Sequence, residues 1–238
     1  MEHHLDLTID FETCSLSANA AVMQVAIVPW LRDKDCAPFF NGQPAEHFVG
    51  YVDLRTCVVK GFDFDPKTIE WWSRQSDAAK ASVCAELPEP INDVLKNALD
   101  YVRNLMEENK AQSVCLWCQG PDLDIAILRN LCLKFGMKLE DYIPHTSFRD
   151  CRTVILEAAL IMSERRRCDA SSPDGVLFPD ADLPTASQLL VSPSKAYALY
   201  PPLPDLYSHG ESHDAVYDAV RSTWNTWYAL KWLRGEAK

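Results

Sequence analysis

Two acidic side chains stand close together near the start of the chain. Residues 5–13 alternate apolar and polar side chains, as a strand does, and include Asp10 and Glu12. Because side chains alternate between the faces of a strand, these two acids share one side of the extended chain. They repel each other unless a cation lies nearby, and oxygen ligands suit hard cations such as Mg²⁺. The pair is therefore either the start of a metal site or an ordinary solvated pair at a strand end.

Two further acids follow a second apolar segment. Residues 112–118 predict a buried central strand, and the chain then turns at Gly120 and Pro121 into a helical pattern. Asp122 and Asp124 therefore lie at the carboxyl end of a strand, where open α/β sheets gather their ligand sites. An acid in the first turn of a helix is also commonly a cap. We assign the cap to Asp122 and a role in a site to Asp124.

The last acids come with a histidine near the C-terminus, where an apolar stripe predicts a helix. Asp214 and Asp218 are four residues apart and so share a helix face. Ser212 is the expected N-cap, which puts His213 at the start of the helix. Since imidazole exchanges protons near neutral pH, His213 is the candidate general base, with His209 as the alternative. The ordinary alternative for His213 is a hydrogen bond to a backbone group.

The elements that must position these residues have an α/β pattern. Three strands with short connections predict an antiparallel meander, and the later strand precedes a helix. The predicted strands cover residues 5–13, 20–30, 46–54 and 112–118. The predicted helices cover residues 66–76, 88–109, 125–131, a segment after 148–154 and the C-terminal region from 212.

Two adjacent tryptophans lie on the predicted helix 66–76. Trp71 and Trp72 cannot face the same way on a helix. One arrangement packs one ring on the core and leaves the other in a cleft, where a nucleic-acid base stacks on it. In the other arrangement both rings only pack.

Composition limits the class of protein and its partners. The chain has 238 residues, 47% of them hydrophobic, enough for one large domain, which we take to span 1–238. A net charge of −11 argues against tight binding of long duplex nucleic acid, but not against a substrate reached through bound cations. No apolar run is long enough to span a membrane, so no membrane partner is expected.

The cysteines and a low-periodicity segment complete the organisation. The chain has 9 cysteines and no signal peptide, which predicts a reducing, cytoplasmic location. Cys115 and Cys118 form a C-x-x-C that we interpret as buried thiols rather than a zinc or redox site. Residues 168–207 are rich in Pro, Ser and Asp, and we expect a loop-rich insertion there that serves as a lid or a homodimer contact.

Together, these motifs resemble those of a known superfamily. D-x-E on a first strand, an aspartate at a strand-to-helix switch and H-x-x-x-x-D on a late helix resemble the DEDD 3′–5′ exonucleases in their histidine-bearing (DEDDh) form. I-D-F-E-T followed by A-A-V-M-Q-V-A, T-I-E-W-W-S-R-Q and R-D-C-R-T resemble the phage and bacterial 3′–5′ exoribonuclease-like branch. The resemblance covers residues 5–160 and 208–232. Leu123 departs from the phenylalanine usual in the family.

The resemblance implies a fold, a cofactor and a reaction. The fold is an RNase H-like mixed sheet, an antiparallel three-strand meander plus parallel strands, flanked by helices. Two Mg²⁺ or Mn²⁺ ions are implied, with Asp10 bridging both, Glu12 and Asp218 completing the first, and Asp124 holding the second. His213 is the implied general base. The implied reaction hydrolyses single-stranded RNA or DNA from its 3′ end to nucleoside 5′-monophosphates. The candidate substrate-binding residues are Phe11, Thr13, Trp71 and Trp72.

Two other functions remain open at this stage. One is a non-catalytic module of the same fold that binds a nucleotide or a protein. The other is a phosphodiesterase for small dinucleotides or cyclic nucleotides. The acidic charge favours short or single-stranded oligonucleotides over duplexes in either enzymatic case.

Overall fold

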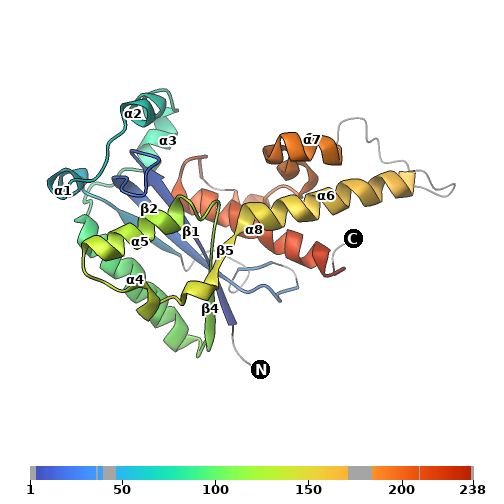
Figure 1. Ribbon diagram of the computed structural model, residues 1–238, viewed down its shortest axis with the longest axis horizontal. Coiled ribbons are helices and arrows are strands. Elements are labelled where there is room, and N and C mark those ends of the chain that lie inside the picture. The colour runs from blue at the N-terminus through green and yellow to red at the C-terminus, as the bar shows by residue number, and fades with distance from the viewer. Residues whose placement is uncertain (1–3, 36, 40–46, 171–183, 209, 237–238) are drawn as a thin grey trace.

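A mixed β-sheet forms the centre of the molecule. The computed structural model describes residues 4–35, 37–39, 47–170, 184–208 and 210–236. Within them, the five strands are ordered β3-β2-β1-β4-β5 (Figure 1). β1 pairs antiparallel with β2, and β2 with β3, whereas β1–β4 and β4–β5 are parallel. The strands are β1 (His4–Thr13), β2 (Val22–Trp30), β3 (Phe48–Tyr51), β4 (Ser113–Cys118) and β5 (Phe148–Asp150). The predicted mixed sheet with an antiparallel meander is confirmed; β5 is a strand that the sequence did not predict.

Helices form at each predicted segment, and α1, α3 and α7 are three short helices that the sequence analysis did not predict. α2 begins at Pro66, and the Asp65 carboxylate before it accepts from two backbone amides of the first turn. The α-helices are α1 (Leu54–Val59), α2 (Pro66–Ser73), α3 (Asp77–Ser82), α4 (Ile91–Glu108), α5 (Asp124–Lys134), α6 (Cys151–Ala170), α7 (Ala186–Val191) and α8 (Ala215–Leu233). The 3₁₀ turns are η2 (Leu139–Asp141), η3 (His145–Ser147), η4 (Pro193–Leu199) and η5 (Asp205–Tyr207). No helix in the described ranges is long and apolar enough to cross a bilayer.

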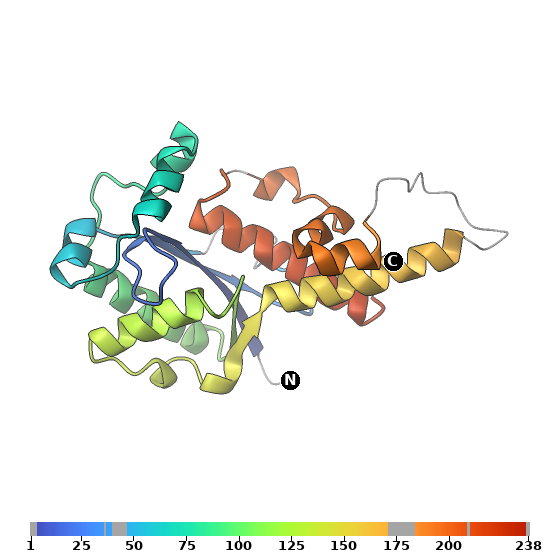
Figure 2. The ribbon, with the colours of Figure 1, turned by 45° about the horizontal axis from the view of Figure 1, so that its top comes forward.

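The sheet lies between two layers of helices. α4 and α5 cover one face, and α6 and α8 cover the other (Figures 1 and 2). On the first face Leu7 and Ile9 of β1 are buried against α4 and α5. On the second face Trp30 and Trp117 are buried with residues of α6 and α8. Two separate apolar cores therefore fix the sheet from both sides.

The polar face of β1 is covered rather than solvated. Asp6, Thr8 and Glu12 are all buried, and Asp10 is partly buried. Because these residues point toward α8, that helix must supply partners for them. The Thr223 hydroxyl of α8 donates to the Thr8 hydroxyl over 2.7 Å, in the middle of the interface.

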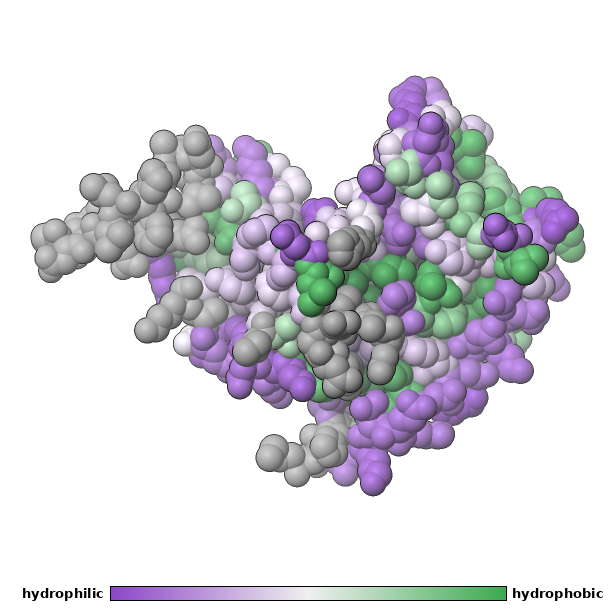
Figure 3. All heavy atoms as spheres, turned by 180° about the vertical axis from the view of Figure 1, so that it is seen from behind, coloured by the Kyte–Doolittle hydropathy of each residue, from purple (hydrophilic) through white to green (hydrophobic). Residues whose placement is uncertain are grey.

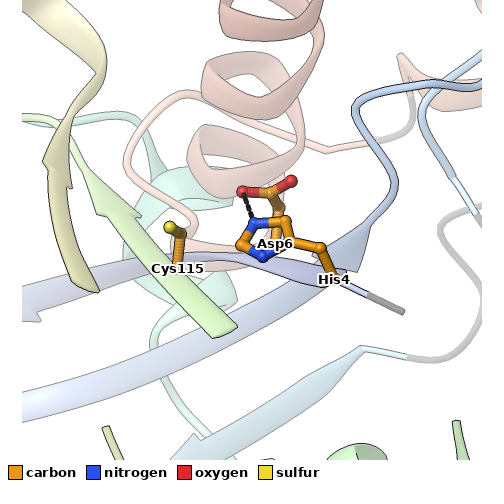
Figure 4. A group of neighbouring side chains, drawn as sticks. All are labelled: His4, Asp6 and Cys115. Atoms are coloured by element: carbon orange, nitrogen blue, oxygen red, sulfur yellow. Dashed lines mark hydrogen bonds and ion pairs between the residues drawn. The ribbon is translucent and has the colours of Figure 1, made fainter. Parts of the chain in front are cut away.

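A buried ion pair satisfies the first of these polar residues. Asp6 has 0% exposure, and its carboxylate accepts from Arg32 Nε at 2.8 Å and from Trp117 Nε1 at 2.7 Å. His4 and Cys115 lie beside it (Figure 4). The Arg32 guanidinium also donates to His4 Nε2 at 2.9 Å. Because the Arg32 guanidinium already neutralises the Asp6 carboxylate, we interpret this group of side chains as one that stabilises the start of β1 rather than as a metal site.

The segment that the sequence marks as an insertion is largely helical where it is described. α6 continues to Ala170, residues 171–183 lie outside the described ranges, and α7, η4 and η5 follow. Leu199 and Tyr200 are buried, and the Tyr200 hydroxyl donates to the Ile155 carbonyl of α6. Packed turns thus replace the expected loops over much of 184–207, because their apolar residues complete the second core. That this segment is an insertion stays a prediction.

Removing the Arg32 charge is expected to destabilise the fold. Arg32→Met leaves the Asp6 carboxylate buried without a counter-ion, which costs about 3 kcal/mol of unfolding free energy. Urea unfolding measures this loss. The control is Arg55→Gln, since Arg55 is exposed and pairs only with the neighbouring Asp53, so no measurable change is expected. A loss below about 1 kcal/mol for Arg32→Met would show that the buried pair is not a stabilising clamp.

Candidate active site

The end of β1 places two acids toward α8. Asp10 pairs with Ala26 of β2, and Glu12 pairs with Gln24. Both acids therefore lie near the C-terminal end of β1, the central strand of the sheet. Glu12 is 8% exposed. The alternation that made the sequence prediction therefore holds, and the two carboxylates share the covered face of the strand.

The turn after β4 delivers the third acid. Gly120 has a φ of +119°, a conformation that residues with a Cβ rarely adopt, and α5 then begins at Asp124. Asp124 is 4% exposed. The residue in the N-cap position is Leu123, without a side-chain cap, while Asp122 is exposed on the turn. The predicted capping role of Asp122 is therefore wrong, because α5 begins one residue later than such a cap requires and no capping side chain accepts a bond from its first turn.

The start of α8 is held by a different residue from the one predicted. Asp214 is the N-cap, and its carboxylate accepts from the backbone amides of Val216 and Tyr217 at 2.9 and 3.4 Å. Ser212, the expected cap, is exposed. His213 precedes the helix with a φ of +72°, and its backbone N–H donates to Asp218 Oδ2 at 3.0 Å. This bond compensates an unusual backbone conformation and orients the carboxylate.

The buried side chain of Gln24 links α8 to the sheet by a hydrogen bond. Gln24 has 0% exposure, and its Oε1 accepts from the backbone N–H of Ala215 at 2.9 Å. Its Nε2 donates to the Ser82 carbonyl of α3 at 3.2 Å. Gln24 is also the partner of Glu12 across the β1–β2 ladder. One side chain therefore connects the strand that carries the acids to the helix that carries Asp218.

The four predicted acids line one open pocket. Asp10, Glu12, Asp124 and Asp218 converge from β1, α5 and α8 around a cavity of about 240 Å³. The remaining lining residues are Phe11, Gln119, Leu123, Arg152, Tyr197 and Arg221. Seen from behind, the molecule is hollowed between the part formed by α2 and α3 and the part formed by α6 to α8 (Figure 3).

Burial raises the pKa of all four acids, and repulsion from neighbouring carboxylates adds to the shift for Asp10, Glu12 and Asp218. Burial, then the charges of Asp218, Asp214 and Asp124, raises the pKa of Glu12 from 4.5 to about 8. Burial raises the pKa of Asp124 from 3.8 to about 7, against the opposing Arg152 charge. The pKa values of Asp10 and Asp218 are also raised, again chiefly by burial. The protein alone therefore does not stabilise four ionised carboxylates here.

His213 lies beside the cluster, next to the two tryptophans. Ligand atoms of Glu12, His213 and Asp218 all lie within 4.8 Å of one another. The His213 ring meets the Trp71 ring nearly edge-on, with the centroids 4.7 Å apart. Trp72 is buried and its indole N–H donates to the Thr13 carbonyl at 2.9 Å, whereas Trp71 is 41% exposed. Trp72 thus packs, and Trp71 presents a ring to solvent beside His213.

The other predicted residues have mixed surroundings. Phe11 lines the pocket from the backbone of β1 while belonging to the first core. Thr13 is buried, and its hydroxyl donates to the Ser15 carbonyl at 2.7 Å. His209, the alternative base, lies outside the described residues. Cys115 and Cys118 are free and buried, and burial raises the pKa of both thiols, as expected of packed side chains.

Several residues of the site were missed by the sequence analysis. Gln119 directly follows β4, so its place at a strand end was a usable signal. Arg221 comes three residues after Asp218 and thus shares its helix face. Arg152 stands in the first turn of α6. Tyr197 comes from a segment without periodicity, and no sequence signal marked it.

Comparisons with known proteins agree with this geometry. Residues 5–173 match the 3′–5′ exoribonuclease Rv2179c-like domain. The chain is 29% identical over 130 residues to an exodeoxyribonuclease of Enterobacteria phage T4, an alignment that covers 53% of this chain. It spans about half of that relative, 55% of its length.

A solved structure shares the overall fold. The nuclease domain of 3′hExo, described as a DEDDh family member bound to rAMP, superposes with a TM-score of 0.50. The superposition covers 98% of this chain and 94% of that domain, at 12% sequence identity. The sheet order, the helical layers and the clustered acids thus occur on the fold of a DEDDh nuclease. By the match over most of its length, this chain belongs to the 3′–5′ exoribonuclease Rv2179c-like domain family.

Proposed function

We propose that this protein is a divalent-metal-dependent 3′–5′ exonuclease that releases nucleoside 5′-monophosphates from single-stranded nucleic acid. The observation that carries the proposal is the convergence of Asp10, Glu12, Asp124 and Asp218 in one open pocket. Family membership supports the reaction class. The presence of all four acids speaks against a non-catalytic binding module, which has no need to hold so many repelling carboxylates together.

The donor set fits two Mg²⁺ or Mn²⁺ ions. All four groups are carboxylates, the ligands that these ions prefer, and burial raises the pKa of each, so a bound cation would favour their ionised forms. Asp10 would contact both ions, Glu12 and Asp218 one of them, and Asp124 the other. When bound, such ions stabilise the attacking and leaving oxygens of an in-line displacement.

His213 is suited to move the proton of the reaction. Its imidazole lies beside Glu12 and Asp218, where it takes a proton from the attacking water as that water bonds to phosphorus. Contact with the Trp71 and Trp72 rings limits the orientations of the imidazole. The backbone N–H of the same residue orients the Asp218 carboxylate, so one residue serves both proton transfer and ligand placement.

The substrate is proposed to be single-stranded and flexible. The half-exposed Trp71 ring offers a surface on which a terminal base stacks, next to the imidazole. A net charge of −11 gives no basic track for a long duplex. The family description names RNA and the phage relative DNA, so both sugars belong in the first assays. The described cysteines are free, which suits the cytoplasmic location that we propose.

Substitution of the proposed base or of one ligand is expected to abolish turnover. His213→Ala and Asp124→Asn should each lower kcat by at least about 100-fold, the typical value of a positioned acid–base group or of an ion ligand. Digestion of 5′-labelled RNA and DNA oligonucleotides with Mn²⁺ measures this, with product analysis for nucleoside 5′-monophosphates. Arg55→Gln serves as the surface control. Full activity in either site variant would refute the role assigned to that residue, and cleavage confined to cyclic or dinucleotide substrates would favour the small-nucleotide phosphodiesterase.

Without metal, the protein is expected to lose stability as the pH rises from about 5 to 8. In this window the folded protein keeps protons on Glu12 and Asp124, whereas the unfolded chain has released them. The free energy of unfolding therefore falls as the pH rises toward the folded-state pKa values of about 8 for Glu12 and about 7 for Asp124. The sum is on the order of a few kcal/mol.

Thermal unfolding in EDTA across this pH range measures the effect. Glu12→Gln should flatten the profile, because the substituted amide does not ionise. Mn²⁺ should raise Tm most at pH 8, where the carboxylates are free to bind it. A metal-free wild-type Tm that stays constant from pH 5 to 8 would contradict this electrostatic account of the pocket.

A further inference from the structure

A second pocket adjoins the acidic one. It has a volume of about 440 Å³, within the usual range for ligand sites. Gln119, Arg152 and Tyr197 line both pockets, so the two lie side by side. The other lining residues are Ile155, Leu156, Pro193 and Ser194.

The second pocket differs in chemistry from the first. None of its lining residues is acidic, and its walls combine apolar side chains with a guanidinium. The Arg152 side chain makes no hydrogen bond or ion pair with a described residue. It lies over Gly120, where a Cβ would stand 2.8 Å from Arg152 Nη1. Glycine at this turn thus leaves room for a free cation at the junction of the two pockets.

Hydrogen bonds link the wall of the second pocket to α8, the helix that carries Asp218. The Tyr197 hydroxyl donates to Gln119 Oε1 at 3.1 Å, and the Gln119 amide donates to the Ser222 hydroxyl. Ser222 in turn donates to the Asp218 carbonyl at 2.7 Å. The Arg221 guanidinium lies 5.3 Å from the centroid of the Tyr197 ring. The wall is therefore held in place relative to the acids.

We infer that this second pocket is the subsite for the nucleotide that precedes the 3′-terminal one, with Arg152 contacting the strand's phosphate backbone. The inference rests on the proposed function. In that reaction the water oxygen bonds to phosphorus, the P–O3′ bond breaks, and the preceding nucleotide leaves with a 3′-hydroxyl. The substrate must therefore extend from the acidic pocket in two directions.

The two directions have different surroundings. On the Glu12 side stand His213 and the exposed Trp71 ring, which suit the terminal nucleotide. On the other side stands the second pocket, with apolar surface for a base or sugar and a guanidinium for phosphate. Pro193, Ser194 and Tyr197 lie beyond the family match at 5–173, in the turn packed beside α7 and α6 (Figure 2). This part of the pocket wall therefore comes from a segment that the family model does not cover.

Two substrates separate this subsite from the catalytic pocket. A phosphorylated dinucleotide, pTpT, contains a preceding nucleotide, whereas the p-nitrophenyl ester of thymidine 5′-monophosphate has only a nitrophenol there. Ser194→Trp fills the pocket from an exposed position, and Arg152→Gln removes its cation. We expect each variant to lower kcat/KM for pTpT at least tenfold, mainly through KM for Ser194→Trp. The loss on the ester should be at least fivefold smaller.

Matched controls test for general effects of bulk and charge. Val191→Trp adds the same ring at an exposed site outside the pocket, and Arg55→Gln removes a distant charge, so both should cleave the two substrates like the wild type. Equal losses on pTpT and on the ester in Ser194→Trp and Arg152→Gln would overturn the subsite. So would unchanged cleavage of pTpT. A wild-type protein that cleaves neither substrate with Mn²⁺ would instead overturn the proposed function itself.

Discussion

The covered polar face of β1 is the constraint on which the structure depends. A strand that alternates apolar and polar residues normally turns its polar side to water, yet here α8 lies over that side. Asp6 is neutralised by Arg32, and Thr8 is paired with Thr223. The acids that follow have no basic partner of that kind, so repulsion and lost hydration raise their pKa values. The fold thus gathers carboxyl groups that ionise less readily than usual at one end of an otherwise satisfied interface.

Several independent contacts hold the start of α8 in place. Its N-cap is Asp214, its first residue bonds to the buried Gln24, and the residue before the cap has a left-handed backbone. That conformation points the His213 amide at Asp218 and leaves the ring against Trp71. Strain of this kind persists only where the surroundings hold it, and here cap, glutamine and carboxylate do so together. The positions of the proposed base and of a proposed metal ligand are therefore set by the same few residues.

The two sides of the acidic pocket differ in their side chains. Aromatic rings stand on the side of Glu12, whereas the guanidiniums of Arg152 and Arg221 stand on the side of Tyr197. The acids of β1 and α5 and the tryptophans of α2 lie in the part of the chain that the family model matches. Asp218 of α8 lies outside it. The wall around Tyr197 comes from outside that match. The fold therefore joins a matched and an unmatched part of the chain into one site, since α8 also lies outside the match.

Local patterns in the sequence were enough to predict four of the five described strands, the main helices and the four acids that line one pocket. Strand periodicity put Asp10 and Glu12 on one face, a Gly-Pro turn marked Asp124, and helical spacing marked Asp218. Patterns of this kind predict structure correctly because they follow from the geometry of the strand and helix backbone. The three-dimensional structure was needed to show that Asp214 rather than Ser212 caps α8, that Asp122 does not cap α5, and that Tyr197 and Arg152 line the acidic pocket. Those outcomes depend on contacts between segments far apart in the chain, whose free energies no local pattern encodes.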